Sequence, residues 1–208
     1  EIVLKDGSKA RGQYLITSVG SFSAGYVPDF KGIDSFKGIT SHTRGWPAEG
    51  IDLAGKRVGV IGTGASGVQL ITEIAKEVGH LTVFQRTANY CAPLRNGPID
   101  DETQKQIKAS YPEIFRVCME TPGSFIHEFD KRSAMDVSKE ERLEQYERLW
   151  AEPGFKKWLS NFHDVMVPGE ANEDYAEFVR NKIRERVHDP AIAEMLVPMD
   201  HMFGSKRL

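Results

Sequence analysis

Cysteine is scarce in this sequence, and the only two, Cys91 and Cys118, stand far apart. This spacing fits neither a paired-cysteine metal knuckle nor the dense disulfide framework of a small secreted protein. Among the histidines other than His42, no pair stands at metal-ligand spacing, so we expect no metal site. A reducing, cytoplasmic environment is the expected location.

Long apolar runs and a strong charge of one sign are also missing. No stretch reaches the roughly 18 consecutive apolar residues that cross a bilayer, and the first residues lack the pattern of a signal peptide. The net charge of −3 gives no reason to expect a nucleic-acid or anionic-membrane partner. The sequence does not begin with methionine, and no stop signal is visible after Leu208, so we expect further chain on both sides of it.

The sequence is long and apolar enough for a globular core, with 208 residues of which 40% are hydrophobic. Residues 1–28 begin with a hairpin pattern over residues 1–20, in which the second apolar run is Tyr14 to Ile16. A lone hairpin is marginal, which predicts that it belongs to a sheet of another domain. Residues 29–50, rich in glycine and proline, are predicted to be an ordered linker.

Residues 51–98 have the pattern of a strand, a glycine turn, a helix and a second strand. Val58 to Ile61 is a continuous apolar run, typical of a parallel strand that is buried on both faces. Val68 to Val78 has helical apolar spacing, and His80 to Arg86 is a second strand. The order predicts an α/β fold, a Rossmann-like doubly wound nucleotide-binding domain.

Residues 99–196 are predicted to be a helical insertion in that domain, after which residues 197–208 return to it in extended or loop form. Two segments, 139–150 and 172–187, carry apolar side chains at helical spacing. The predicted buried faces are Leu143, Tyr146, Leu149 and Trp150 in the first segment, and Tyr175, Phe178, Val179, Ile183 and Val187 in the second. Asp189 and Pro190 are a suitable cap and first residue for a further short helix.

The glycine turn is the motif that carries the most chemistry. It runs Gly62, Thr63, Gly64, Ala65, Ser66 and Gly67. In a dinucleotide site the first glycine permits the turn, the second lets backbone N–H groups approach a pyrophosphate, and the third allows close helix-strand packing. The helix N-terminus adds about half a positive charge. Gln69 on the first helical turn could donate to a phosphate, although a surface glutamine is an equal interpretation.

The end of the second strand favours NADPH over NADH. An NAD site would place a carboxylate there to accept from the ribose hydroxyl, whereas this sequence has Gln85, Arg86 and Thr87. Arg86 could make a charge-assisted contact with a 2′-phosphate, and Thr87 could add a hydroxyl. The alternative is that Arg86 is only a solvated strand end.

A second motif precedes the nucleotide motif. Phe36, Gly38, His42, Trp46 and Pro47 stand at the fixed positions of an FxGxxxHxxxW(P/D) pattern. This pattern resembles the fingerprint of type I Baeyer-Villiger monooxygenases, and the similarity continues in residues 83–90 and 203–207. The resemblance implies an FAD domain and an NADPH domain with a helical insertion, which convert ketones and O2 to esters or lactones through a flavin peroxide.

The resemblance also implies roles for single residues. Arg86 and Thr87 would contact the adenosine phosphate, Lys206 the 2′-phosphate, and Arg207 would be the catalytic arginine beside the flavin. The fingerprint residues, His42 and Trp46 above all, would couple the movements of the two domains. Two alternatives for His42 are direct acid-base catalysis and a purely structural role. The family's ATG tripeptide is replaced by Ser18-Val19-Gly20.

By the same resemblance the FAD site lies mostly in N- and C-terminal parts of the enzyme outside this sequence, so the chain alone is expected to be inactive. Two other interpretations stay open. One is a flavin monooxygenase that oxygenates nitrogen or sulfur. The Trp46-Pro47 pair favours the Baeyer-Villiger family over this interpretation. The other is a non-catalytic NADP-binding fragment.

Overall fold

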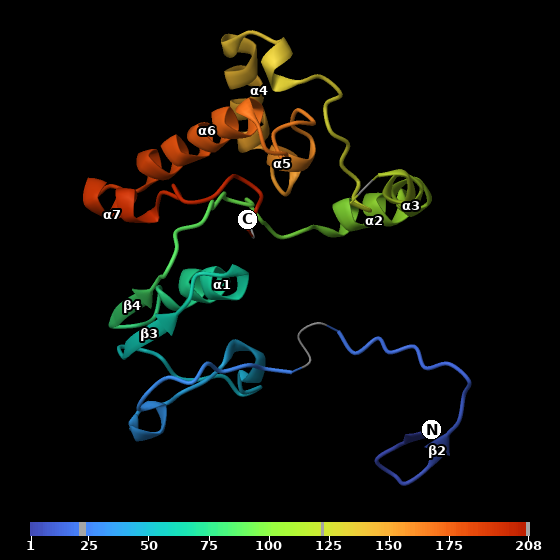
Figure 1. Ribbon diagram of the computed structural model, residues 1–208, viewed down its shortest axis with the longest axis vertical. Helices are drawn as coiled ribbons and strands as arrows, with labels where there is room; N and C mark the ends of the chain where they lie inside the picture. The colour runs from blue at the N-terminus through green and yellow to red at the C-terminus, as the bar shows by residue number, and fades with distance from the viewer. Residues whose placement is uncertain (21–23, 122, 207–208) are drawn as a thin grey trace. The chain divides into compact units, whose positions relative to one another are not determined.

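The computed structural model describes residues 1–20, 24–121 and 123–206 (Figure 1). The chain divides into two compact units, Glu1–Asp52 and Leu53–Leu208. Among the described residues, no helix is both long enough and apolar enough to span a membrane.

The first unit begins with the predicted hairpin, in a shorter form. Strands β1 (Ile2–Val3) and β2 (Lys9–Ala10) pair antiparallel, with Ile2 opposite Ala10. The Asp6 carboxylate accepts from the Ser8 N–H at 2.9 Å and fixes the turn between them. The second strand does not extend to the predicted apolar run at Tyr14 to Ile16, which is exposed because no described residue of this unit covers it. Two 3-10 helices follow, η1 (Ile33–Ser35) and η2 (Thr43–Gly45).

The second unit opens with the predicted strand-helix-strand motif. Strands β3 (Arg57–Ile61) and β4 (His80–Phe84) pair in parallel, with Val60 opposite Val83, and helix α1 (Ala65–Ile74) connects them. The α/β fold class is therefore confirmed, with two parallel strands among the described residues.

The prediction that the first of these strands is buried on both faces is wrong. Val60 is 7% exposed, but Ile61 and the paired Phe84 are 67% and 57% exposed. The physical reason is that the described sheet has only two strands and packs α1 against one side, so its burial is one-sided.

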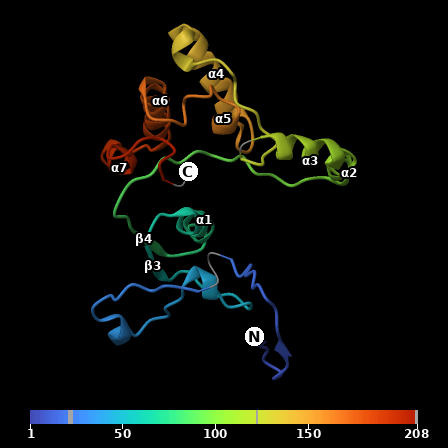
Figure 2. The ribbon, with the colours of Figure 1, turned by 45° about the vertical axis from the view of Figure 1, so that its right-hand side comes forward.

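Helices fill the region between residues 101 and 196. They are α2 (Asp101–Ala109), α3 (Tyr111–Glu120), α4 (Lys139–Ala151), α5 (Lys156–Leu159), α6 (Glu170–Arg186) and α7 (Pro190–Leu196), with a 3-10 turn η3 (Ala134–Asp136) before α4. In Figures 1 and 2 the helices α4 to α7 gather together, while α2 and α3 stand to one side. The core of the unit lies on α4, α5 and α6 and on the chain between α5 and α6, and it also takes in Tyr90, Ala134 and Phe203.

The helical faces were predicted well for α6 and less well for α4. On α6, Tyr175, Phe178, Val179 and Ile183 are buried. On α4 the buried face is centred on Gln145, Tyr146 and Leu149. Leu143 therefore faces solvent, at 41% exposed, and the prediction that it is buried is wrong. The predicted cap of the last helix is confirmed, since the Asp189 carboxylate accepts from the N–H groups of Ala191 and Ile192.

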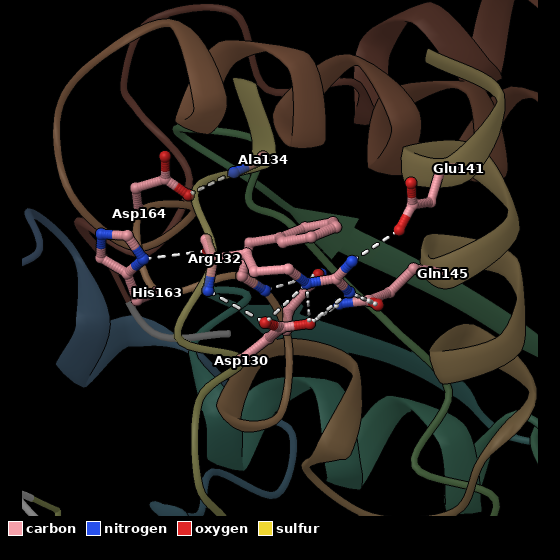
Figure 3. Close-up of polar contacts among 9 residues, drawn as sticks. Asp130, Arg132, Ala134, Glu141, Gln145, His163 and Asp164 are labelled. Atoms are coloured by element: carbon pink, nitrogen blue, oxygen red, sulfur yellow. Dashed lines mark hydrogen bonds and ion pairs between the residues drawn. The ribbon is translucent and has the colours of Figure 1, made fainter. Parts of the chain in front are cut away.

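A polar network ties the segment before α4 to that helix (Figure 3). The Arg132 guanidinium meets the Asp130 carboxylate at 2.7 Å and that of Glu141 at 2.5 Å. Asp130 also accepts from the Gln145 amide at 3.3 Å. The hydrogen bonds from Arg132 are the largest of the effects that hold the pKa of Asp130 well below its usual range. This carboxylate is thus an ionised anchor between two parts of the helical region.

Candidate nucleotide-binding site

The glycine turn connects β3 to α1 and is fixed to the end of β4. The Gly62 N–H donates to the Phe84 carbonyl oxygen at 2.9 Å, so the turn lies beside the last residue of that strand. Gly62 has φ +98°, a conformation that favours glycine. Gly64 is the N-cap residue of α1 and makes no side-chain cap hydrogen bond. The first N–H groups of the helix therefore stay available to a ligand.

Close packing explains the third glycine of the motif. A Cβ atom on Gly67 would come within 2.4 Å of the Gly62 carbonyl oxygen, so a side chain there requires the turn or the helix to move. A Cβ atom on Gly64 would meet nothing within 4 Å, so the space beside the turn is open. The turn thus has the two properties that a pyrophosphate needs: close approach to backbone N–H groups and room for the phosphates. Ser66 and Gln69, also predicted for this site, are exposed on α1.

The residues that follow β4 lie next to the turn. Arg86 is exposed and Thr87 is half-buried. Residues 85–90 contain no carboxylate that would repel a second phosphate group. The Gln85 amide is occupied elsewhere, since it donates to the Met195 carbonyl oxygen at 3.1 Å.

The segment after α7, residues 197–206, returns toward the same place. The His201 ring approaches the Asn89 amide oxygen at 3.2 Å, which brings this segment beside the chain that follows β4. Lys206 is exposed and lies 3.9 Å from the Asp200 carboxylate. Arg207, the predicted catalytic residue, lies outside the described residues.

The fingerprint residues lie in the other unit, where they shape the linker. A Cβ atom on Gly38 would meet the Phe36 ring at 2.6 Å, so this glycine leaves room for the ring. The His42 ring accepts from the Arg44 N–H at 3.1 Å through Nδ1 and thereby caps η2. Trp46 follows η2 at 38% exposed, directly before Pro47.

Sequence reasoning missed a buried polar group beside the candidate site. Arg180 on α6 is 4% exposed and contacts Tyr90, which is 1% exposed. The missed signal is the spacing on α6: Ala176, Arg180 and Ile183 share the buried face at intervals of four and three residues. An arginine in that stripe must have partners inside the fold.

Comparisons with known proteins agree with this geometry. The model of the flavin-binding monooxygenase-like family matches residues 10–93. The chain is 44% identical over 214 residues to 2-oxo-Delta(3)-4,5,5-trimethylcyclopentenylacetyl-CoA monooxygenase of Pseudomonas putida, a match that covers 100% of this chain and 39% of that relative. It is 42% identical over 201 residues to cyclohexanone 1,2-monooxygenase of an Acinetobacter species, which covers 96% of this chain and 37% of that relative.

Solved structures give the same result in three dimensions. Cyclohexanone monooxygenase from Rhodococcus sp. Phi1 bound to NADP+ superposes with a TM-score of 0.89 at 42% identity, over 98% of this chain and 38% of that one. The crystal structure of OTEMO in complex with FAD and NADP gives a TM-score of 0.88 at 47% identity, over 92% of this chain and 37% of that one. The chain thus spans less than two fifths of each relative's length. Along nearly all of its own length, it is a homologue of a segment of the flavin-dependent Baeyer-Villiger monooxygenases.

Proposed function

We propose that this chain binds NADPH as part of an FAD-dependent monooxygenase that inserts one oxygen atom of O2 into a ketone to give an ester or lactone. The observation that carries the proposal is the glycine turn at the N-terminus of α1, with its open side at Gly64 and its close contact at Gly67. The division into 1–28, 29–50, 51–98, 99–196 and 197–208, and the cytoplasmic location, belong to the same proposal.

The nucleotide would be held at three places in the second unit. The N–H groups at the start of α1 would bind the pyrophosphate, because they have no acceptor inside the helix. Arg86 and Thr87 would bind the 2′-phosphate beside the turn, and Lys206 would reach it from the return segment. A guanidinium and an ammonium group would together balance the charge that distinguishes NADPH from NADH.

The first test replaces one cation. Arg86→Ala should weaken NADPH binding by about 1–3 kcal/mol, which is roughly five- to 150-fold, because a charge-assisted contact is lost. NADH binding should change little, since NADH has no 2′-phosphate. Calorimetry with both nucleotides on the 208-residue chain measures the two affinities. An equal loss for both nucleotides would remove Arg86 from the 2′-phosphate site.

FAD, when bound and reduced by NADPH, supplies the activation of O2. The chain's own contribution to that chemistry would come from Arg207, whose positive charge would stabilise negative charge developing near the flavin. Its neighbour Lys206 serves the nucleotide instead. In an enzyme completed with the FAD-binding segments, Arg207→Ala should therefore abolish ester formation and leave NADPH affinity unchanged, whereas Lys206→Ala should raise the Kd for NADPH.

An exchange of segments tests the oxygenase proposal. The matching segment of the Acinetobacter cyclohexanone monooxygenase, 42% identical, would be replaced by this chain. The hybrid should form the lactone from cyclohexanone with NADPH, and Arg207→Ala in the hybrid should not. A hybrid that binds FAD and NADPH but consumes no O2 in the presence of ketone would contradict the proposal.

A second activity has one observation in its favour. The chain is also 39% identical over 189 residues to a phenazine N-monooxygenase of Lysobacter antibioticus. Nitrogen oxygenation is therefore the alternative. Assaying the hybrid with cyclohexanone and with a phenazine separates the two by product: an ester supports the first activity and an N-oxide the second.

A further inference from the structure

One buried tyrosine joins the chain that follows β4 to the return segment. The Tyr90 hydroxyl donates to the His201 carbonyl oxygen at 3.2 Å. The Tyr90 ring makes edge-to-face contacts with His201 and Phe203, at centroid distances of 5.5 and 5.3 Å. In Figure 1 the red segment that leaves α7 runs back beside the green segment after β4. Tyr90 thus stands three positions after Thr87 and directly against the segment that carries Lys206.

The buried guanidinium of Arg180 holds this tyrosine and the return segment together. One nitrogen, Nη2, donates to the Tyr90 hydroxyl at 2.9 Å, and Nε donates to the Pro198 carbonyl oxygen at 2.9 Å. The third nitrogen, Nη1, is paired with Glu173 at 2.5 Å and with Glu177 at 3.2 Å. Arg180 therefore ties α6 to Tyr90 and, through Pro198, to the start of the return segment.

A second set of contacts continues from this point toward Lys206. The Asn89 amide oxygen accepts from the Tyr90 N–H at 3.0 Å and faces the His201 ring at 3.2 Å. The other ring nitrogen of His201 lies 2.5 Å from the Asp200 carboxylate, whose second oxygen is 3.9 Å from Lys206. Lys206 is thus linked to the Tyr90 backbone through Asn89, His201 and Asp200, and the last step is an exposed ion pair.

Packing alone does not explain a charged side chain at this place. An apolar side chain could fill the same volume on α6 without the desolvation cost of a buried guanidinium. The arginine instead demands acceptors at fixed positions, and two of its acceptors, the Tyr90 hydroxyl and the Pro198 carbonyl, lie on the two segments that flank the candidate 2′-phosphate site. Such a network permits one register of the return segment and disfavours others.

We propose that Arg180 and Tyr90 are positioning residues, which hold the return segment against the chain after β4 so that Lys206 reaches the 2′-phosphate. The inference rests on the proposed NADPH site. It adds that the preference for NADPH over NADH is set partly by two residues that touch neither nucleotide.

The test removes a single oxygen atom. Tyr90→Phe keeps the ring and its packing but removes the acceptor for Arg180 and the donor to His201. We expect NADPH binding to weaken about five- to tenfold, the size of one net hydrogen bond, with NADH binding unchanged. Calorimetry with each nucleotide on the 208-residue chain gives the ratio of affinities, which a merely structural defect would leave constant.

Two further variants make the comparison specific. Tyr146→Phe is the matched control: Tyr146 is 0% exposed, and its hydroxyl donates to Asp174 rather than to the return segment. The double variant Tyr90→Phe with Lys206→Ala tests whether Tyr90 acts through the lysine. If it does, the double variant binds NADPH no more weakly than Lys206→Ala alone.

The possible outcomes separate the inference from the function on which it rests. If the wild-type chain binds NADPH and NADH equally, the NADPH proposal fails and the inference fails with it. If the wild type prefers NADPH but Tyr90→Phe keeps that preference, or weakens both nucleotides equally, only the inference fails. Should Tyr90→Phe not fold, Asn89→Ala at the half-buried neighbour must give the selective loss instead, and an unchanged ratio there overturns the inference.

Discussion

Among single residues, the glycines of the turn differ in what a methyl group would do to them. Gly64 has φ −71° and open space at its Cβ position, so Gly64→Ala should leave the fold intact. A Cβ atom on Gly67 would lie 2.4 Å from the Gly62 carbonyl oxygen, so Gly67→Ala should lower the free energy of unfolding by about 1–3 kcal/mol, as overpacking does.

In the Gly64→Ala and Gly67→Ala variants, the effect on nucleotide binding should differ from the effect on stability. A methyl group on Gly64 would occupy the space where the pyrophosphate approaches, so Gly64→Ala should lose NADPH binding at unchanged melting temperature. Thermal unfolding and calorimetry on both variants measure the two effects. Full NADPH affinity in Gly64→Ala would mean that the phosphates do not lie at the turn.

Some residues of the candidate site could be identified from the sequence, and others could not. Glycine spacing and a strand-terminal arginine are local patterns, so the turn, Arg86 and Thr87 could be selected from the sequence. The burial of Arg180 could have been inferred from its place in the apolar stripe of α6, but its partners could not, because Tyr90 and Pro198 are distant from it in sequence. Only the folded chain shows which groups this arginine binds.

At the scale of elements, the network around Asp130 gives the helical region a dependence on pH. The pKa of Asp130 is lowered mainly by hydrogen bonds from Arg132, so the folded state stabilises the carboxylate in its ionised form. The resulting stability is present above the ordinary pKa of 3.8 and is lost as the pH falls through the lower pKa of the folded state.

Asp130→Asn should therefore destabilise the chain at pH 6 and much less at acidic pH. Urea unfolding of the wild type and the variant at pH 6 and in steps below pH 4 measures the difference. We expect the gap between the two unfolding midpoints to narrow as the pH falls. A gap that is equally wide at every pH would show that Asp130 contributes by packing rather than by charge.

Element positions were largely predictable and element environments were not. Helices α4 and α6 follow from apolar spacing, and the cap at Asp189 follows from its residue type. The exposure of Ile61 and Phe84 does not follow, because an apolar strand is expected to be covered on both faces. Burial depends on which neighbours are present, and a local pattern of residues does not contain that information.

At the scale of the whole molecule, the proposed nucleotide contacts all fall within the second unit. The glycine turn, Arg86 and Lys206 belong to Leu53–Leu208, whereas the fingerprint residues belong to Glu1–Asp52. A chain lacking residues 1–52 should therefore bind NADPH with the affinity of the 208-residue chain.

Calorimetry on the shortened chain checks this expectation, with circular dichroism as the control for folding. A folded but non-binding shortened chain would mean that the first unit contributes to the nucleotide site. Unchanged binding would leave the fingerprint residues with a role other than nucleotide affinity, as the coupling hypothesis for His42 and Trp46 requires.

The contact between Tyr90 and His201 also has a consequence for the order of folding. It joins residues 111 positions apart, and the intervening chain includes helices α2 to α7. Closing so long a loop costs conformational entropy that is offset only after the intervening helices have packed. The contact between these two segments is therefore expected to be one of the last to form as the newly made chain folds.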